Sequence, residues 1–256
     1  MSKQETQSIR EQNKAAWNIA AKHFYGGGAL PCWGALGEES NNPNLIGEII
    51  GKTFLEIGCG SGHSIDYLIK QGAEKVYGLD LSEEQIKFAQ ELNQKAIALG
   101  KVELFNKPME EESILEQESV DTAFSIYGIG WTQDIQKTLS NIYCYLKPGG
   151  RLIFSFETQL FARTQFDKET ASFAINGSSH EEYTKELKDW FGAKASITYH
   201  LPNTWIRYCL DLDFKLIDYF EPRPLFINTE DPDLMLYYDK AKVEKIAPTF
   251  IMIFKK

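Results

Sequence analysis

A short apolar stretch that breaks into closely spaced glycines constrains this chain more than any other feature. Residues 53–57 (TFLEI) are followed by Gly58, Gly60 and Gly62 in the pattern Gly-x-Gly-x-Gly. A buried strand that ends in such a loop and leads directly into a helix is typical of the first unit of a parallel nucleotide-binding sheet. Glycine permits a positive φ and lets a ligand approach the backbone closely, so the loop predicts a ligand site.

A second apolar run lies at the distance that this arrangement requires. Residues 76–79 (VYGL) precede Asp80, eighteen residues beyond Gly62. In nucleotide-binding folds, an acid at the end of the second strand holds the hydroxyl groups of a ribose. The dinucleotide fingerprint, however, requires a third glycine where this chain has His63. The spacing therefore favours a nucleoside-type ligand that has no pyrophosphate.

The glycine loop and two later segments resemble motifs of the class I S-adenosylmethionine-dependent methyltransferases. The loop with its preceding acid, Glu56, is similar to the first motif of that family. Residues 119–127 (SVDTAFSIY) resemble the fourth strand, and residues 146–155 (LKPGGRLIFS) resemble the turn into the fifth. Together with Asp80, these motifs extend over residues 51–157 in the expected order. The resemblance implies S-adenosylmethionine as the cofactor and methyl transfer as the reaction.

The alternation of strand-like and helix-like segments predicts the rest of the fold. Parallel strands are expected at 53–57, 76–80, 101–105, 122–127 and 151–156. Helices are expected at 62–71, 83–98, 133–146 and 204–212. A sixth strand at 214–221 and a terminal antiparallel strand at 249–254 follow. This order predicts an α/β fold: a Rossmann-like doubly wound sheet, mostly parallel with an antiparallel C-terminal strand, and with helices on both faces.

Two segments lie outside this alternating pattern. Residues 5–22 have the periodicity of an amphipathic helix, so residues 1–50 are expected to form an N-terminal helical lid. Residues 51–256 would then form the methyltransferase domain. Because connections of some forty residues are uncommon in compact domains, we expect an inserted cap at about 158–205, with a helix at about 180–191.

Composition restricts the class of protein and of partner. The chain is 43% hydrophobic and 25% charged, as in ordinary globular domains. A net charge of −9 without a dense Lys/Arg cluster argues against a nucleic-acid partner. The polar start and the lack of a long apolar run predict neither a signal peptide nor a membrane span. Four scattered cysteines predict no metal site and fit a cytoplasmic protein, which we expect to be a monomer or homodimer.

The family resemblance implies a role for each residue around the expected cofactor. Glu56 would hold the methionine ammonium group, and Asp80 would accept both ribose hydroxyls through its two oxygens. The adenine side departs from the family pattern, because Pro108 stands where many relatives have an acid. The expected cofactor-binding residues are Glu56, Gly58, Cys59, Gly60, Asp80, Leu81, Met109, Glu110 and Tyr127.

The acceptor side is predicted from aromatic residues and one histidine. Tyr127 ends the fourth expected strand, where the family transfers the methyl group, and an aromatic face there would attract a sulfonium. His200 would be a general base for a hydroxyl acceptor or a substrate ligand, or else a surface or capping residue. The candidate catalytic residues are thus Tyr127 and His200. The candidate substrate contacts are Tyr25, Trp131, Tyr199 and His200.

These residues predict in-line methyl transfer to a small, partly apolar acceptor, for which the enzyme mainly aligns the reacting groups. Aromatic residues between positions 156 and 191 suit such a pocket. Three alternatives remain open. The chain would otherwise be a non-catalytic S-adenosylmethionine-binding sensor or partner subunit, an RNA or protein methyltransferase, or a nicotinamide oxidoreductase, which the glycine spacing disfavours.

Overall fold

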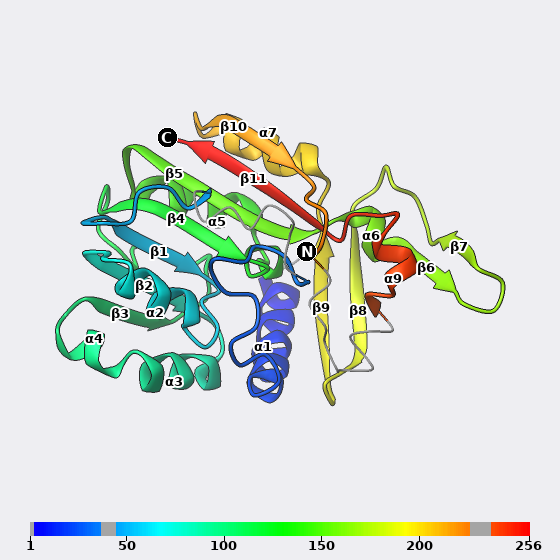
Figure 1. Ribbon diagram of the computed structural model, residues 1–256, viewed down its shortest axis with the longest axis horizontal. Helices are drawn as coiled ribbons and strands as arrows, with labels where there is room; N and C mark the ends of the chain where they lie inside the picture. The colour runs from blue at the N-terminus through cyan, green and yellow to red at the C-terminus, as the bar shows by residue number, and fades with distance from the viewer. Residues whose placement is uncertain (1–2, 37–44, 226–236) are drawn as a thin grey trace.

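A seven-stranded sheet forms the centre of the computed structural model, which describes residues 3–36, 45–225 and 237–256 (Figure 1). The strand order is β10-β11-β5-β4-β1-β2-β3. The parallel strands are β1 (Thr53–Ile57), β2 (Lys75–Asp80), β3 (Val102–Asn106), β4 (Val120–Ile126) and β5 (Leu146–Glu157). The antiparallel strand β11 (Thr249–Lys255) lies between β5 and β10 (Lys215–Phe220).

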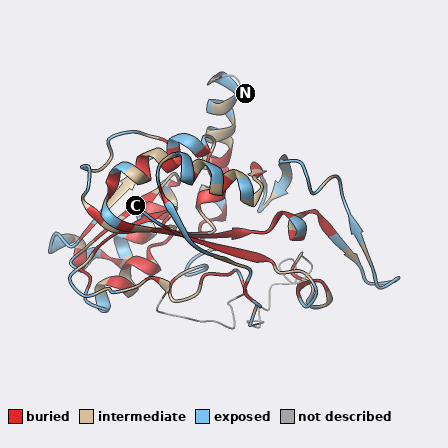
Figure 2. Ribbon diagram, turned by 90° about the horizontal axis from the view of Figure 1, so that it is seen from above, coloured by how far each residue is buried: buried red, intermediate tan, exposed pale blue. Residues whose placement is uncertain are grey.

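Helices pack on both faces of this sheet. The helices on the sheet are α2 (His63–Lys70), α3 (Glu83–Leu92), α4 (Gln94–Ala98), α5 (Ile135–Tyr145) and α7 (Pro202–Asp211), whereas α1 (Lys3–Ala20) lies beyond its end. Apolar side chains of α5 and α7 form one core cluster with the sheet, and those of α2, α3 and α4 form a second. Figure 2 shows the strands buried between these layers. The predicted Rossmann-like fold, mostly parallel with an antiparallel C-terminal strand, is confirmed.

A separate group of short elements extends from one end of the sheet (Figure 1). It comprises α6 (Gln159–Arg163), β6 (Thr164–Asp167), β7 (Ser172–Ile175), β8 (Tyr183–Trp190) and β9 (Ala193–Tyr199), with α9 (Lys240–Val243) beside β6. The helix predicted at 180–191 is wrong, because β8 occupies this stretch and pairs antiparallel with β9. The residues of this stretch favour a helix locally. Their side chains are alternately half-buried and exposed, as in a strand, so pairing with β9 outweighs the local preference.

The helix predicted at 83–98 is interrupted at Asn93. The side-chain amide of Asn93 donates to the backbone oxygen of Gly62 at 3.1 Å and to that of Ala89 at 3.0 Å. The first bond connects the end of α3 to the glycine loop. The interruption between α3 and α4 therefore helps to hold the loop in place.

Helix α1 lies at the end of the sheet to which the parallel strands point (Figure 1). Asn13 exchanges two hydrogen bonds of 2.8 Å with the backbone of Ser196 in β9. Asn18 accepts a bond of 2.7 Å from the Ser82 hydroxyl and donates to Glu83, which also pairs with Lys14. These contacts connect α1 both to β9 and to the start of α3. No described helix is long and apolar enough to cross a membrane.

The backbone at Gly62 gives a testable measure of how tightly the loop packs. Gly62 has φ of +77°, and an added Cβ would lie 2.8 Å from Cβ of Ala89. We expect Gly62→Ala to lower the free energy of unfolding by about 3 kcal/mol, because backbone strain adds to overpacking.

Gly51 is the matched control: it has φ of +69° and open space around its Cβ position. Gly51→Ala should cost only about 1 kcal/mol in urea denaturation. Equal losses for both variants would contradict the packing argument.

Candidate functional site

Two carboxyl groups and the glycine loop converge at the carboxyl ends of β1 and β2. Asp80 Oδ2 accepts a hydrogen bond of 2.9 Å from the Gly60 amide, and Oδ1 accepts one of 2.8 Å from the Ser82 amide. Burial raises the pKa of Asp80 to about 6, although these backbone bonds oppose the shift. The two amides therefore fix the orientation of this carboxylate, while lone pairs remain on both of its oxygens.

Glu56 is the more deeply buried of the two acids, with 3% of its surface exposed. Its Oε2 atom has no hydrogen-bond partner among the described residues. Burial raises the pKa of Glu56 to about 8, a bond from Ser64 opposes the rise, and the negative charge of Asp80 adds to it. A buried carboxyl oxygen without a donor is costly unless a ligand supplies one. This corner of the site is therefore suited to an ammonium group.

The glycine loop passes very close to the loop that follows β4. Gly58 has φ of +70°, and an added Cβ would lie 2.9 Å from Cα of Gly128. Gly60 also has a positive φ, of +50°. Between them Cys59 is buried, and burial raises the pKa of its thiol, so this side chain fills space as a neutral group. Helix α2 begins after Gly62 without a side-chain cap, which leaves its first amides available to an anion.

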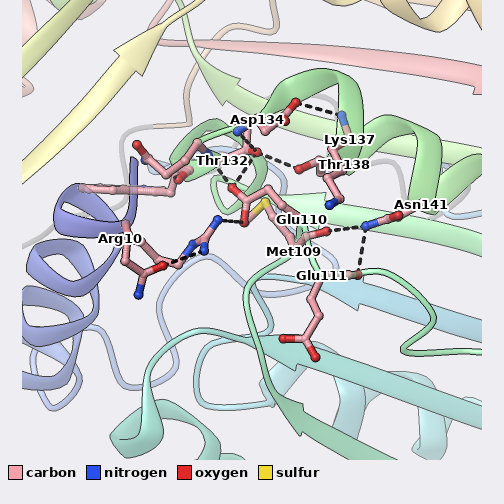
Figure 3. Close-up of polar contacts among 12 residues, drawn as sticks. Arg10, Met109, Glu110, Glu111, Thr132, Asp134, Lys137, Thr138 and Asn141 are labelled. Atoms are coloured by element: carbon pink, nitrogen blue, oxygen red, sulfur yellow. Dashed lines mark hydrogen bonds and ion pairs between the residues drawn. The ribbon is translucent and has the colours of Figure 1, made fainter. Parts of the chain in front are cut away.

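The residues beyond β2 and β3 form the expected adenine side. The side-chain amide of Asn106 donates to the backbone oxygen of Leu81 at 2.9 Å. The backbone oxygen of Met109 accepts a bond of 3.2 Å from the Asn141 amide (Figure 3). Leu81 and Met109 are thus held in place through their backbones, and both side chains remain partly exposed.

The carboxylate of Glu110 bonds within the chain (Figure 3). Its Oε1 atom accepts from the Thr132 hydroxyl at 3.0 Å and from the Gln133 amide. Its Oε2 atom lies 3.6 Å from Nη2 of Arg10 on α1. Because both oxygens have partners and the residue is 6% exposed, Glu110 connects α1 to the segment before α5. Its sequence position gave no sign of this partnership with residue 10.

Tyr127 follows β4 in a backbone conformation that is uncommon for an aromatic residue. It has φ of +56°, and its hydroxyl lies 2.5 Å from Oγ1 of Thr249 on β11. Its ring centroid is 5.9 Å from that of Phe156. A bulky residue in the left-handed region stores strain, and such residues concentrate at functional sites. The functional role expected for Tyr127 stays a prediction.

Three tryptophans from three different elements meet beside this position. Trp17 of α1, Trp131 of the short helix η2 (Ile129–Trp131) and Trp190 of β8 have ring centroids 4.7 to 5.2 Å apart. Phe24 packs against Trp17 and Trp190. We call these four residues the tryptophan cluster. The sequence named Trp131 as a candidate substrate contact and counted Trp190 among the aromatic residues suited to the pocket, but it did not predict that these two residues meet Trp17.

The remaining candidate acceptor contacts have different surroundings. Tyr25 is 51% exposed and packs edge-on against His63 of the glycine loop at 4.7 Å. Tyr199 is buried, and its hydroxyl donates to Glu157 Oε2 at 2.7 Å. Nδ1 of His200 lies 2.9 Å from Glu182 Oε2, and the same carboxylate accepts the Leu201 amide. The N-cap of α7 is Leu201, and the His200 ring bonds to the carboxylate of Glu182.

Known proteins are similar to this chain over the elements that form the site. A family model described as a methyltransferase domain matches residues 55–154, which contain the glycine loop, Asp80 and Tyr127. A solved S-adenosylmethionine-dependent methyltransferase from Mesorhizobium loti superimposes with a TM-score of 0.64 at 21% identity, over 82% of this chain and 93% of that one. Residues 55–154 thus match a methyltransferase domain, and the solved structure shows a shared fold. The carboxyls of Glu56 and Asp80 around the glycine loop offer acceptors that suit an ammonium group and ribose hydroxyls.

Two curated relatives differ in how far the likeness extends. A protein of Haemophilus influenzae without an assigned function is 27% identical over 218 residues, 79% of this chain and 85% of the relative. The malonyl-[acyl-carrier protein] O-methyltransferase of Yersinia pestis is 31% identical over 109 residues. That likeness covers only 41% of this chain and 36% of the Yersinia protein. A match over so small a part of both chains does not identify the acceptor of this chain.

Proposed function

We propose that this chain transfers the methyl group of S-adenosylmethionine to a small, partly apolar acceptor by in-line displacement. When bound, the cofactor supplies a methyl group on a positively charged sulfur. The observation that carries the proposal is Glu56 Oε2, a buried carboxyl oxygen without a donor at the glycine loop. In the proposal, Glu56 binds the ammonium group of the cofactor and Asp80 binds its ribose.

The other proposed cofactor contacts follow from their places around the loop. The backbone of Gly58, Cys59 and Gly60 lies against the cofactor, and Leu81 and Met109 pack on the adenine. Glu110 acts through Arg10, because its carboxylate already bonds within the chain. This pairing makes α1 part of the binding site, so residues 1–50 serve as a lid that excludes water.

The acceptor side is proposed from the aromatic residues around Tyr127. The tryptophan cluster, which includes Trp131, provides apolar and π surface, and Tyr25 borders the glycine loop. Tyr127 walls the sulfonium, which aromatic faces attract. The ring centroid of Tyr199 lies 6.0 Å from that of Phe156, the residue that packs against Tyr127. The bond between His200 Nδ1 and Glu182 orients the imidazole, which suits a general base as well as a structural role.

Transfer of labelled methyl groups tests the proposal. The purified protein is incubated with methyl-labelled S-adenosylmethionine and with separate small-molecule, RNA and protein fractions of a cell extract. We expect label to enter the small-molecule fraction, and the Asp80→Asn variant to label none. Label in RNA or protein instead would overturn the proposed acceptor class. Tight cofactor binding without transfer to any fraction would show that the protein is a sensor.

A further inference from the structure

A short exposed segment crosses the candidate cofactor site between two buried anchors. Residues 22–28 are exposed apart from the half-buried Phe24, whereas Ala21 before them and Leu30 after them are buried. The amides of residues 23–25 donate to carbonyl oxygens only a few positions earlier. A segment with exposed side chains and local backbone bonds is of the kind that opens locally in folded proteins. We call residues 22–28 the strap.

The middle of the strap lies on the glycine loop. The Gly26 amide donates a hydrogen bond of 3.0 Å to Ser61 Oγ, and the ring centroid of Tyr25 lies 4.7 Å from that of His63. A Cβ on Gly26 would lie 3.3 Å from Nε2 of His63. The strap therefore contacts both residues that flank Gly62.

The far end of the strap reaches the places proposed for the methyl group and the methionine end of the cofactor. A Cβ on Gly28 would lie 3.7 Å from Cγ2 of Ile126, the last residue of β4. Two residues after the strap, the Leu30 amide donates at 3.1 Å to Ser64 Oγ, and Ser64 bonds to the carboxyl of Glu56. A cofactor bound as proposed would therefore lie beneath the strap.

The tip of the β8–β9 hairpin packs on the strap, beside α1 (Figure 1). Phe191 is the first residue of the two-residue loop between Trp190 and Ala193, which pair with each other. The ring centroid of Phe191 lies 4.2 Å from that of His23 and 5.1 Å from that of Phe24. Phe191 thus connects the tip of the cap to the strap.

Phe191 is an unusual residue for this loop. It has φ of +52°, and Gly192 after it has φ of +84°. Two positive φ values are what a type I′ turn requires, and asparagine, aspartate or glycine normally occupies the first of these positions. A bulky side chain there stores strain, which persists only where other contacts compensate it. The rings of His23 and Phe24 provide that compensation, so Phe191 suits contact with the strap better than it suits the turn.

We propose that Phe191 is the latch of a gate: its ring holds the strap closed over the cofactor site, and release of this contact lets the cofactor and its product exchange. The inference rests on the proposed function, because the site beneath the strap is the one proposed to bind the cofactor. Gly26 and Gly28 form the hinge, since both already adopt positive φ values, of +76° and +59°, and glycine changes φ freely. The cap thereby controls how fast the cofactor site opens.

Amide hydrogen exchange of the free protein tests the latch without any ligand. Asparagine suits a positive φ, so Phe191→Asn keeps the turn while it removes the ring. We expect the amides of the strap to exchange about tenfold faster in this variant, as for the loss of one or two aromatic contacts. Ala171→Asn is the matched control, because Ala171 lies in the loop between β6 and β7 with φ of +51°. It should leave exchange in the strap unchanged, and so should Phe191→Tyr, which retains the ring.

Cofactor kinetics test whether the strap is a gate. The association and dissociation rate constants of S-adenosylhomocysteine are measured by surface plasmon resonance for wild type and Phe191→Asn. We expect both rate constants to rise about tenfold and the dissociation constant to stay the same, because a gate acts equally on entry and exit. A merely structural defect in the site would instead raise the dissociation constant.

Two results would overturn the inference: unchanged exchange in the strap of Phe191→Asn, or a larger dissociation constant with an unchanged association rate constant. Failure of S-adenosylhomocysteine to bind the wild-type protein would contradict the proposed function. The exchange experiment would still test the latch in that case, because it uses no ligand.

Discussion

Asp80→Asn is expected to weaken binding of S-adenosylmethionine at least 100-fold. In the proposed complex the carboxylate accepts both ribose hydroxyls, and each hydrogen bond to a charged group contributes about 1.5 kcal/mol or more. Loss of two such bonds costs about 3 kcal/mol, which corresponds to roughly a hundredfold in the dissociation constant. The asparagine also presents a donor on one side, where the Gly60 or Ser82 amide needs an acceptor.

Calorimetric titration of the cofactor into both proteins measures this effect. Asp66→Asn is the control, because Asp66 is an acid on α2 that pairs with Lys70 rather than with the loop. It should bind the cofactor as wild type does. Circular dichroism and the melting temperature must show that Asp80→Asn is folded. A folded Asp80→Asn protein with nearly unchanged affinity would remove Asp80 from the binding site.

Glu56→Gln is expected to stabilise the cofactor-free protein while it abolishes detectable cofactor binding. The pKa of Glu56 is about 8 in the folded chain, above its ordinary value of 4.5. Its contribution to folding is therefore fully present below pH 4.5 and is lost as the pH rises toward 8. Glutamine does not titrate. We expect the variant to be more stable than wild type by about 2 kcal/mol at pH 8, less than the full shift allows, because it alters the bond with Ser64.

Urea denaturation at pH 5 and pH 8 measures this difference without cofactor. The stabilisation should be small at pH 5 and near its full value at pH 8. Glu48→Gln provides a control on an exposed side chain that pairs only loosely with Lys52, at 3.8 Å. A Glu56→Gln protein that is less stable than wild type at pH 8, or equally altered at both pH values, would show that the carboxyl is compensated in the free protein.

Most of the central sheet was predictable, because its signals are local. Residues 53–57 and 76–80 are apolar runs that end at acids, and the intervening glycines accept the positive φ values that a tight turn requires. Ser82 followed by Gln85 is likewise a local pattern for the start of a helix, and the Ser82 hydroxyl accepts the Gln85 amide at 3.2 Å. The other half of that capping pattern did not form, since Asp80 takes the Ser82 amide.

The extension after β5 was not predictable, because its structure depends on pairing between distant residues. The stretch 183–190 has locally helix-favouring residues, yet Tyr183 pairs with Tyr199 and Trp190 with Ala193 in the β8–β9 hairpin. The error has consequences for the site, since a helix there would not have placed Trp190 against Trp17 of α1. Strand pairing is a tertiary contact, and no local preference encodes its partner.

The partners of individual charged residues also became visible only in three dimensions. Glu110 was placed near the adenine from its position after β3, whereas the structure turns its carboxylate toward Arg10, a hundred residues earlier. His200 was readable as a base or as a capping residue, and only the structure shows that its ring bonds to Glu182, the residue directly before β8. Burial and charge balance at these positions depend on how α1 and the cap pack against the sheet.

The sequence by itself determined the fold class and the positions of the glycine loop and Asp80, because spacing along one βαβ unit is sufficient to specify them. Only the tertiary structure decided which side chains from distant segments meet. The tryptophan cluster and the tyrosines that bond to Glu157 each come from segments far apart in the chain. Their composition follows from packing at the end of the sheet, where chain order gives no indication of contact.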